Sequence, residues 1–329
     1  MELYARIADL QLDVDGYALE RHEHVTPAWT RVTTTIVMRG GGAEGRGEDV
    51  TYEVPEHDAL AEAAPADLSG VSTFDEASRA LASFGDGYRR WAFESAALDL
   101  ALRQGGQTLG AALGLPYRPV RFCMSTRQDV RAWLDLAPGL EFKLDPEQAW
   151  DDAYLDWMAA SGRVRVLDLK AHYPAATGVS LGPDERLYVA CRDRFDDDTT
   201  IEDAWFADGW LDLFRGHEHR LAFDSIIHSV ADIEALPIVP RRMNIKPSRF
   251  GSIANLFATI EFCKAHRIAL YGGGQTELDI GRDHIQVLAS LFYAAAANDV
   301  APREYNTGVA RLHLPQSPLP APEPAAGIA

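Results

Sequence analysis

The sequence lacks the features that mark membrane proteins and disulfide-rich secreted proteins. No stretch approaches the about 20 consecutive apolar residues that a membrane-spanning helix needs. The first residues show no basic segment followed by an apolar run, so we expect no signal peptide. Cysteine occurs only at Cys123, Cys191 and Cys263, an odd number of widely spaced residues. This pattern favours a protein of the reducing cytoplasm over a disulfide scaffold.

Basic residues are also scarce. Lys and Arg number 31 against 49 Asp and Glu, so the formal net charge is −18 at pH 7. Such a polyanion repels phosphate groups, and no block of Lys or Arg offsets the repulsion. We therefore expect neither nucleic acid nor a membrane as a partner.

The 329 residues, 47% of them apolar, suffice for two domains or for a barrel with an appendage. Residues 32–39 (VTTTIVMR) predict a strand, the glycine-rich residues 39–49 a turn, and residues 50–54 (VTYEV) its partner strand. Residues 16–30 are polar, and we expect them to form a binding loop. Helical spacing of small and apolar residues then covers residues 73–104.

From about residue 119 onward, short apolar segments alternate with amphipathic ones. This alternation is typical of a parallel sheet, either an open doubly wound sheet or a closed barrel. No G-x-G-x-x-G follows the first segment, and seven strands at regular spacing favour the barrel. The predicted strands are residues 118–125, 139–145, 163–171, 199–205, 219–226, 241–248 and 268–274.

Acidic residues stand at the carboxyl ends of three successive predicted strands, where a parallel barrel builds its active site. These are Asp168, Glu202 and Asp224. Three converging carboxylates repel one another and raise at least one pKa unless a cation joins them. Oxygen ligands alone favour Mg²⁺ over Zn²⁺.

Two lysines, Lys143 and Lys246, end the predicted strands on either side of this trio. A dication nearby lowers the pKa of a lysine and makes it a usable general base. Taken singly, such a residue more often caps a helix or reaches solvent, so the evidence lies in the set. His228 follows Asp224 closely and would lie near the barrel mouth, where it contacts substrate or makes a local hydrogen bond.

This order of residues, with NIKPSRFG (residues 244–251) and YGGGQTELDIG (residues 271–281), resembles the enolase superfamily. The similarity is to its muconate-lactonizing-enzyme-like branch, the mandelate racemase/muconate lactonizing enzyme family. It implies an α/β fold, a modified (β/α)7β TIM-type barrel with an N-terminal α+β capping domain. The implied parts are a capping domain (1–85), a helical lead-in (86–118), the barrel (119–311) and a disordered or extended Pro- and Ala-rich tail (312–329).

The resemblance also implies roles for individual residues. Asp168, Glu202 and Asp224 would be the Mg²⁺ ligands, and Lys143 and Lys246 the catalytic lysines. Further residues that would contact substrate or support the site are Lys170, Glu277, Gln275 and His228.

Two positions depart from the family pattern. Glu141 stands where the first lysine of the family's Lys-x-Lys is expected, and Lys170 where an asparagine is usual. By the two-residue period of a strand, Lys170 shares the inward face of Asp168. It either neutralises a substrate carboxylate or reduces metal affinity.

The implied function is Mg²⁺-dependent abstraction of a proton α to a carboxylate, through an enediolate that the metal stabilises. Racemase or epimerase, cycloisomerase and dehydratase (o-succinylbenzoate-synthase-like) reactions all remain open. So do a catalytically silent enolase-like binding protein and a Schiff-base aldolase using Lys246 or Lys170. We expect a small carboxylate substrate, a homo-oligomer and a cytoplasmic location.

Overall fold

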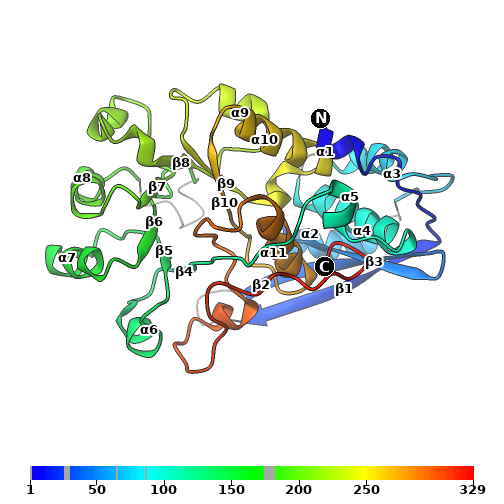
Figure 1. The fold of residues 1–329 in the computed structure, drawn as a ribbon, viewed down its shortest axis with the longest axis horizontal. Helices are drawn as coiled ribbons and strands as arrows, with labels where there is room; N and C mark the ends of the chain where they lie inside the picture. Colours follow the sequence, from blue (N-terminus) through cyan, green and yellow to red (C-terminus); the bar gives the residue numbers. More distant parts are fainter. Residues whose placement is uncertain (1, 26–29, 64–65, 86, 174–181) are drawn as a thin grey trace.

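The computed structural model describes residues 2–25, 30–63, 66–85, 87–173 and 182–329. It contains a three-stranded antiparallel sheet of order β1-β2-β3 and a seven-stranded parallel sheet of order β10-β9-β8-β7-β6-β5-β4. The two sheets lie in two lobes of the molecule (Figure 1). The expected α/β fold, a curled parallel sheet with an N-terminal capping domain, is confirmed.

The capping sheet pairs β1 (Gly16–Val25), β2 (Thr30–Gly40) and β3 (Ala43–Asp49). The strand predicted at residues 32–39 is confirmed. Two expectations are wrong: residues 16–25 form a strand instead of a loop, and the partner of β2 is β3 instead of residues 50–54. Residues 26–29 of the expected loop lie outside the described residues.

The glycines of β3 serve packing, which is why the sequence misled us there. Only Gly41 and Gly42 form the turn, with φ of 54° and 77°, as a two-residue hairpin loop requires. A Cβ on Gly45 would lie 2.2 Å from the Leu100 nitrogen, and one on Gly47 2.0 Å from the Ala92 oxygen. Helix α4 (Tyr88–Gln104) therefore packs directly on the backbone of β3.

The helices of the amino-terminal part are short apart from α4, which is buried from Trp91 to Leu102. Apolar side chains of α3 and α4 join one continuous buried cluster that extends into the barrel. None of the helices among the described residues is long and apolar enough to cross a membrane. The other helices are α1 (Glu2–Ala5), α2 (Val54–Glu62), α3 (Phe74–Ala80) and α5 (Leu109–Leu113).

All seven predicted barrel strands are present, and neighbours in the sheet follow chain order. The strands are β4 (Met124–Thr126), β5 (Phe142–Leu144), β6 (Val164–Asp168), β7 (Thr200–Glu202), β8 (Leu221–Phe223), β9 (Arg242–Ile245) and β10 (Ala269–Gly272). The helices between and after them are α6 (Arg131–Leu136), α7 (Asp152–Ser161), α8 (Glu185–Arg194), α9 (Val230–Glu234), α10 (Ile253–Ala265) and α11 (Ile280–Phe292).

Residues 298–299 take the place of an eighth strand. Asn298 forms a parallel bridge to Phe122, and Asp299 forms one to Gly273. The Asn298 side chain accepts from the Gly272 N–H at 2.7 Å and donates to the Arg121 carbonyl at 2.9 Å. These two residues thus connect the two edges of the parallel sheet.

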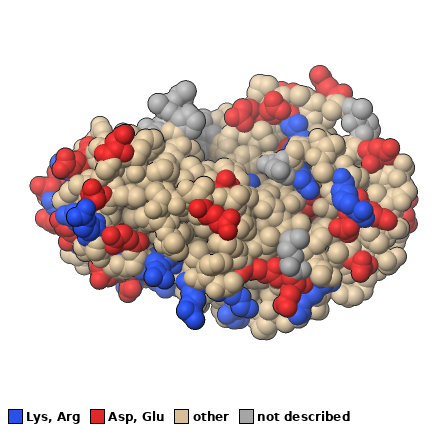
Figure 2. Space-filling model, turned by 90° about the horizontal axis from the view of Figure 1, so that it is seen from above, with Lys and Arg blue, Asp and Glu red and all other residues tan. Residues whose placement is uncertain are grey.

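The tail, residues 312–329, takes the extended form, one of the two alternatives expected for it. Leu319 pairs with Val120 in both backbone directions. The Ile328 N–H donates to Asp99 Oδ1 at 2.7 Å, and its side chain is buried. Backbone hydrogen bonds and apolar contacts therefore order a segment whose composition is typical of a flexible tail. On the face shown in Figure 2, acidic side chains are spread widely, and several basic ones lie along its lower edge.

Candidate active site

Three buried carboxylates converge at the carboxyl ends of adjacent strands. Asp168 ends β6 and lies opposite Glu202, which ends β7, while Asp224 directly follows β8. One oxygen from each lies within 4.8 Å of the others, and none of the three residues is more than 1% exposed. The convergence expected from strand register is therefore present.

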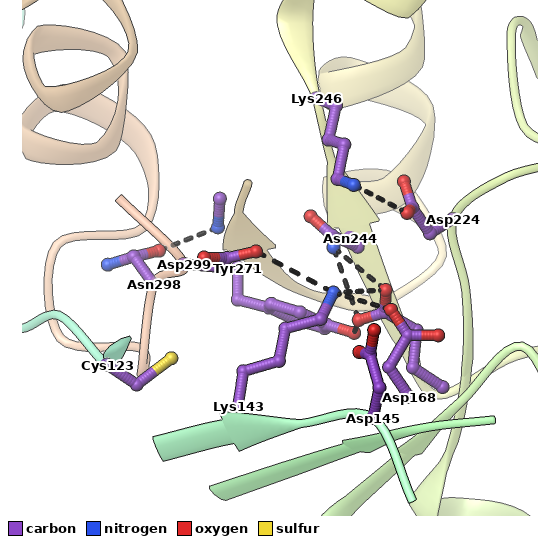
Figure 3. A network of polar contacts seen from close by, with 12 residues as sticks. Cys123, Lys143, Asp145, Asp168, Asp224, Asn244, Lys246, Tyr271, Asn298 and Asp299 are labelled. Carbon is purple, nitrogen blue, oxygen red and sulfur yellow. Dashed lines mark hydrogen bonds and ion pairs between the residues drawn. The ribbon is translucent and has the colours of Figure 1, made fainter. Parts of the chain in front are cut away.

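Two buried lysines contact different carboxylates of this trio (Figure 3). Lys143 Nζ lies 3.0 Å from Asp168 Oδ2 and 2.5 Å from Glu202 Oε1. Lys246 Nζ lies 2.9 Å from Asp224 Oδ2. Because the lysines come from β5 and the end of β9, they approach the cluster from separate sides.

A third lysine, Lys170, also lies in the cluster. Its backbone has φ of 50°, and its Nζ contacts Asp168 Oδ2. The same nitrogen lies 3.7 Å from Asp145 Oδ1, which is the partner of Arg127. The inward orientation expected for Lys170 is therefore observed.

The choice between lysine and arginine separates this cluster from the rest of the chain. Only four of the 31 basic residues are lysines, and three of the four are Lys143, Lys170 and Lys246. Lys264, the fourth, is exposed on α10. Arginine remains protonated in proteins, whereas a lysine amine can lose its proton. The chain thus places its titratable amines almost entirely in one site.

Burial and ion pairing set the pKa values around Lys143. Burial alone would lower the pKa of Lys143, but Asp168 and Glu202 raise it well above its ordinary value. Burial opposes ionisation of Asp168, yet Lys143 and Lys170 hold its pKa well below the usual range. For Glu202, burial and the charge of Asp168 act together and raise the pKa well above its ordinary value. The rise expected for one of three converging carboxylates falls on Glu202.

At the other side of the cluster, burial would raise the pKa of Asp224, but Arg249 and Lys246 lower it. Burial would lower the pKa of Lys246, but Asp224 raises it. Lys170 behaves in the same way, because Asp145 and Asp168 outweigh its burial. The lysines and carboxylates therefore stabilise each other's charged forms.

Sequence reasoning missed the residues that orient Glu202. Asn244 Nδ2 lies 3.2 Å from each carboxylate oxygen of Glu202, and the Tyr271 hydroxyl donates to Oε2 at 2.5 Å. Asp299, from the reduced eighth strand, lies 3.8 Å from Lys143 Nζ. Asn244 stands two residues before Lys246, so the strand period could have indicated it.

The residues around Asp224 were missed as well. Asp203 accepts from the backbone N–H groups of Asp224 (2.8 Å) and Ser225 (3.1 Å), which fixes the start of this loop. Arg249 Nε lies 3.4 Å from Asp224 Oδ1, and Nη2 donates to the Tyr173 hydroxyl at 2.8 Å. Arg249 belongs to NIKPSRFG, so its place in that motif was an available signal.

Of the remaining predicted residues, Gln275 and Glu277 are buried and His228 is exposed. With its amide oxygen toward Arg249 Nε (2.7 Å), Gln275 also donates to the Tyr52 hydroxyl. Glu277 accepts from the Gln275 N–H at 2.6 Å and pairs with Arg282 at 3.0 Å, so it supports the loop after β10. The structure does not bring His228 into the carboxylate cluster: its ring is 51% exposed and lies 3.9 Å from Asp232.

Glu141, the first departure from the family pattern, lies away from the three carboxylates. Its carboxylate accepts from Arg121 at 2.6 and 2.7 Å and from Arg165 at 2.6 Å. Burial opposes its ionisation, but the two arginines hold its pKa below the ordinary value. The negative charge of Glu141 therefore balances arginines at the amino-terminal end of the barrel.

The capping domain holds the loop after β10. Buried Arg31 donates to the carbonyls of Gln275 (2.8 Å) and Thr276 (3.2 Å). Glu48, from β3, accepts from the N–H groups of Leu278 (2.7 Å) and Gly281 (2.8 Å) at the start of α11. The position of this side of the site therefore depends on the capping sheet.

The donor set fits a divalent cation of the magnesium type. All three converging ligand atoms are carboxylate oxygens, the type that Mg²⁺ prefers. Among the described residues, neither Asp224 carboxylate oxygen accepts a hydrogen bond of good geometry, although Lys246 and Arg249 are close. Six largely buried carboxylates face four largely buried cations and the partly exposed Arg127 that pairs with Asp145, which leaves an excess of one formal negative charge. They are Asp145, Asp168, Glu202, Asp203, Asp224 and Asp299, and Lys143, Lys170, Lys246 and Arg249.

Two family models match the chain. The "Domain of unknown function (DUF8230) N-terminal domain" matches residues 5–112, and the "Domain of unknown function (DUF8230) C-terminal domain" matches residues 116–307. This chain belongs to the DUF8230 family. No curated protein has a sequence significantly similar to that of this DUF8230 chain.

Solved structures show that the DUF8230 chain has the fold of the enolase superfamily. Muconate cycloisomerase from Pseudomonas fluorescens is 18% identical with a TM-score of 0.71, covering 96% of this chain and 95% of that chain. An enolase superfamily member from Listeria innocua is 20% identical with a TM-score of 0.65, covering 90% and 86%. Dipeptide epimerase from Methylococcus capsulatus, complexed with Mg ion, is 20% identical with a TM-score of 0.65, covering 86% and 89%.

Proposed function

We propose that this protein is a Mg²⁺-dependent enzyme that removes a proton α to the carboxylate of a small substrate. The observation that carries the proposal is the concentration of three of the chain's four lysines around three converging carboxylates. The enolase-superfamily fold supports it, since the similar structures include a cycloisomerase and a dipeptide epimerase with Mg.

Asp168, Glu202 and Asp224 would hold the cation, which supplies positive charge that stabilises a substrate carboxylate as its α-proton leaves. Lys143 and Lys246 would act at Nζ from separate sides of the substrate. Each lysine must first lose its own proton, and the carboxylates beside it control that loss. Asn244 and Tyr271 hydrogen-bond Glu202, so they would orient this metal ligand.

Two opposed amines suit racemisation or epimerisation, because one can remove the α-proton and the other return it on the opposite face. Cycloisomerisation or elimination needs one base, and the second lysine then acts as a fixed positive charge. We propose that Lys170, paired with Asp168 in this structure, also neutralises a second anionic group of the substrate. We therefore propose an isomerase or lyase that acts on a carboxylate with a further polar or anionic group.

A Schiff-base aldolase is a weaker second candidate. Its lysine nucleophile must be a neutral amine, yet neighbouring carboxylates raise the pKa of Lys143, Lys170 and Lys246. That mechanism includes no cation that would offset these carboxylates. Borohydride reduction in the presence of a carbonyl substrate, followed by mass spectrometry, would detect a trapped lysine.

Exchange of the α-proton tests the proposed enzyme directly. The protein with Mg²⁺ in D₂O is incubated with a panel of carboxylates that includes dipeptides, whose α-proton exchange NMR follows, and muconate, for which NMR follows deuterium entering the α-position of any lactone formed. We expect exchange with at least one substrate, lost in Lys246→Ala or Lys143→Ala and kept in the exposed control Lys264→Ala. Exchange that persists in both site variants would contradict the two-lysine mechanism. Magnesium binding without exchange on any substrate would favour the catalytically silent binding protein.

We also propose that the protein acts in the cytoplasm as a homo-oligomer. Its three cysteines are buried and unpaired, which fits a reducing compartment. Val309 and Leu312 are apolar side chains exposed by 64% and 61% in one segment, and such exposure supports self-association. Light scattering on the purified chain measures the mass, and a monomer mass at all concentrations would contradict the oligomer.

A further inference from the structure

A cavity lies at the opposite end of the barrel from the three carboxylates. Its volume is about 420 Å³, which is within the range of small-molecule sites. Residues at the starts of strands line it, among them Thr200 of β7, Arg242 of β9 and Ala269 of β10. The cavity therefore opens at the amino-terminal ends of strands whose other ends carry the candidate active site.

Small side chains explain why the barrel is hollow here. Bulky branched residues normally fill the interior of such a barrel in layers. In this chain Ala269, Ala296 and Ala297 line the cavity together with Val166. Tyr271 forms its inner wall and donates its hydroxyl to Glu202, so the cavity ends just below the candidate active site.

Guanidinium groups surround this cavity. Arg121 and Arg165 share the single carboxylate of Glu141, which leaves one positive charge of that group uncompensated. Arg242 donates to the carbonyls of Asp198 (2.7 Å) and Asp197 (3.1 Å) and to Thr200 Oγ1 (2.8 Å), all of them neutral acceptors.

Asp198 is the one carboxylate among the lining residues, and Glu141 pairs with two of the lining arginines. Three arginines thus face two carboxylates, an excess of one positive charge in a chain whose net charge is −18. Arginine presents a planar pair of donors that matches carboxylate and phosphate oxygens. The cavity combines this chemistry with room for a small molecule.

We propose that this amino-terminal cavity is a second binding site, for a small anion that carries carboxylate or phosphate groups. The site is built by Arg121, Arg165 and Arg242 and is separate from the candidate active site. It requires neither Mg²⁺ nor the buried lysines, so it stands independently of the proposed function.

Calorimetric titration without Mg²⁺ tests the site, with inorganic phosphate in one arm and succinate in the other. We expect saturable binding of at least one of these probes to the wild-type chain. Arg242→Gln should weaken it about tenfold or more, because one charge-assisted contact is lost. The control Arg215→Gln, whose side chain is 79% exposed and pairs only with Asp212 among the described residues, should bind as the wild type does.

A cavity-filling variant guards against a trivial loss of fold. Ala269→Leu should reduce anion binding while leaving the thermal unfolding midpoint and Mg²⁺ binding unchanged. Binding should also persist in Lys246→Ala, since that lysine is at the other end of the barrel. The proposal is overturned if neither probe binds the wild type, if Arg242→Gln and Ala269→Leu bind as well as it does, or if Lys246→Ala abolishes binding.

Discussion

The two ends of the barrel use the same strands to build clusters of opposite charge. Lys143 of β5 contacts the carboxyl-terminal cluster, whereas Glu141, which directly precedes β5, pairs with the amino-terminal arginines. Strand β9 likewise begins at Arg242 and leads into Lys246. Because these strands are only three to five residues long, residues in the two environments lie only two to four positions apart in the sequence.

The cations at the two ends also differ in kind. Three of the four largely buried cations of the carboxyl-terminal cluster are lysines, whereas all three at the amino-terminal cavity are arginines. Arginine gives a permanent charge suited to binding an anion, and lysine gives a charge that can be released. Arginine is the common cation of this chain, so the difference lies in the gathering of its few lysines at the carboxyl-terminal end.

Replacing a lysine of the carboxyl-terminal cluster by arginine should have the largest effect on activity. Lys246→Arg keeps the positive charge but removes a releasable proton, so turnover should fall about 10²–10⁴-fold if Lys246 is the base. If Lys143 acts only as a fixed charge, Lys143→Arg should retain part of the activity. Turnover numbers on the identified substrate measure both effects, with Lys264→Arg as the exposed control. Full activity in Lys246→Arg would exclude Lys246 as the base.

Metal affinity should depend on the carboxyl-terminal cluster alone. Glu202→Gln should abolish measurable Mg²⁺ binding, because it removes a charged ligand. Asn244→Leu should weaken binding about 10–100-fold, because Asn244 orients that ligand. Calorimetry with Mg²⁺ measures both, and Arg242→Gln at the other end should bind normally. Equal binding by the wild type and Glu202→Gln would remove Glu202 from the metal site.

His284, a buried histidine outside both charged clusters, should make the stability of the fold depend on pH in the acidic range. Burial lowers the pKa of His284, on α11, from 6.5 to about 4. Since the unfolded state protonates first, the free energy of unfolding should fall as the pH drops from 6.5 to 4, by about 3 kcal/mol in all. His284→Leu should remove this fall, as urea unfolding at several pH values will show. An unchanged pH profile in the variant would place the sensitivity elsewhere.

The smallest expected effect concerns Glu141 at the amino-terminal end. Glu141→Gln should destabilise the fold by about 1–2 kcal/mol at pH 7, because two arginines lose a charged partner. The pKa of Glu141 is below its ordinary 4.5 in the fold, so its stabilisation exists above that pH and is lost as the pH falls through the folded-state value. Unfolding in the His284→Leu background measures this difference. If Glu141→Gln had wild-type stability both at pH 7 and below the folded-state pKa, the arginines would need no carboxylate partner.

The barrel was predictable because its information is local. Each strand is a short apolar run, and strand order then places Asp168 beside Glu202. The period of two could have indicated Asn244. It also pointed Lys170 inward, as observed, although a φ of 50° places Lys170 outside the strand and its contact with Asp168 holds it there. The lysine count was a further signal, readable without any structure.

The misses arise where tertiary contacts decide. Asp203 follows the end of β7 with φ of 51°, so no strand period predicts its direction. Asp299 belongs to a bridge of two residues, too short for any sequence pattern. In the capping domain, Gly45 and Gly47 look like turn residues, but contact with α4 makes them part of a strand. Residues 16–25 are polar because β1 is an edge strand.

Glu48 and Arg31 hydrogen-bond the backbone of the loop after β10, and these contacts restrict which sequence changes the capping domain can accept. The two lobes cannot be exchanged as independent modules, because a new capping sheet must bring a carboxylate and a guanidinium to the same backbone groups. A substitution inside the capping sheet can therefore alter selectivity from a distance, by shifting Gln275 relative to Arg249. Relatives with different substrates should show paired changes at these two places, inherited as one unit.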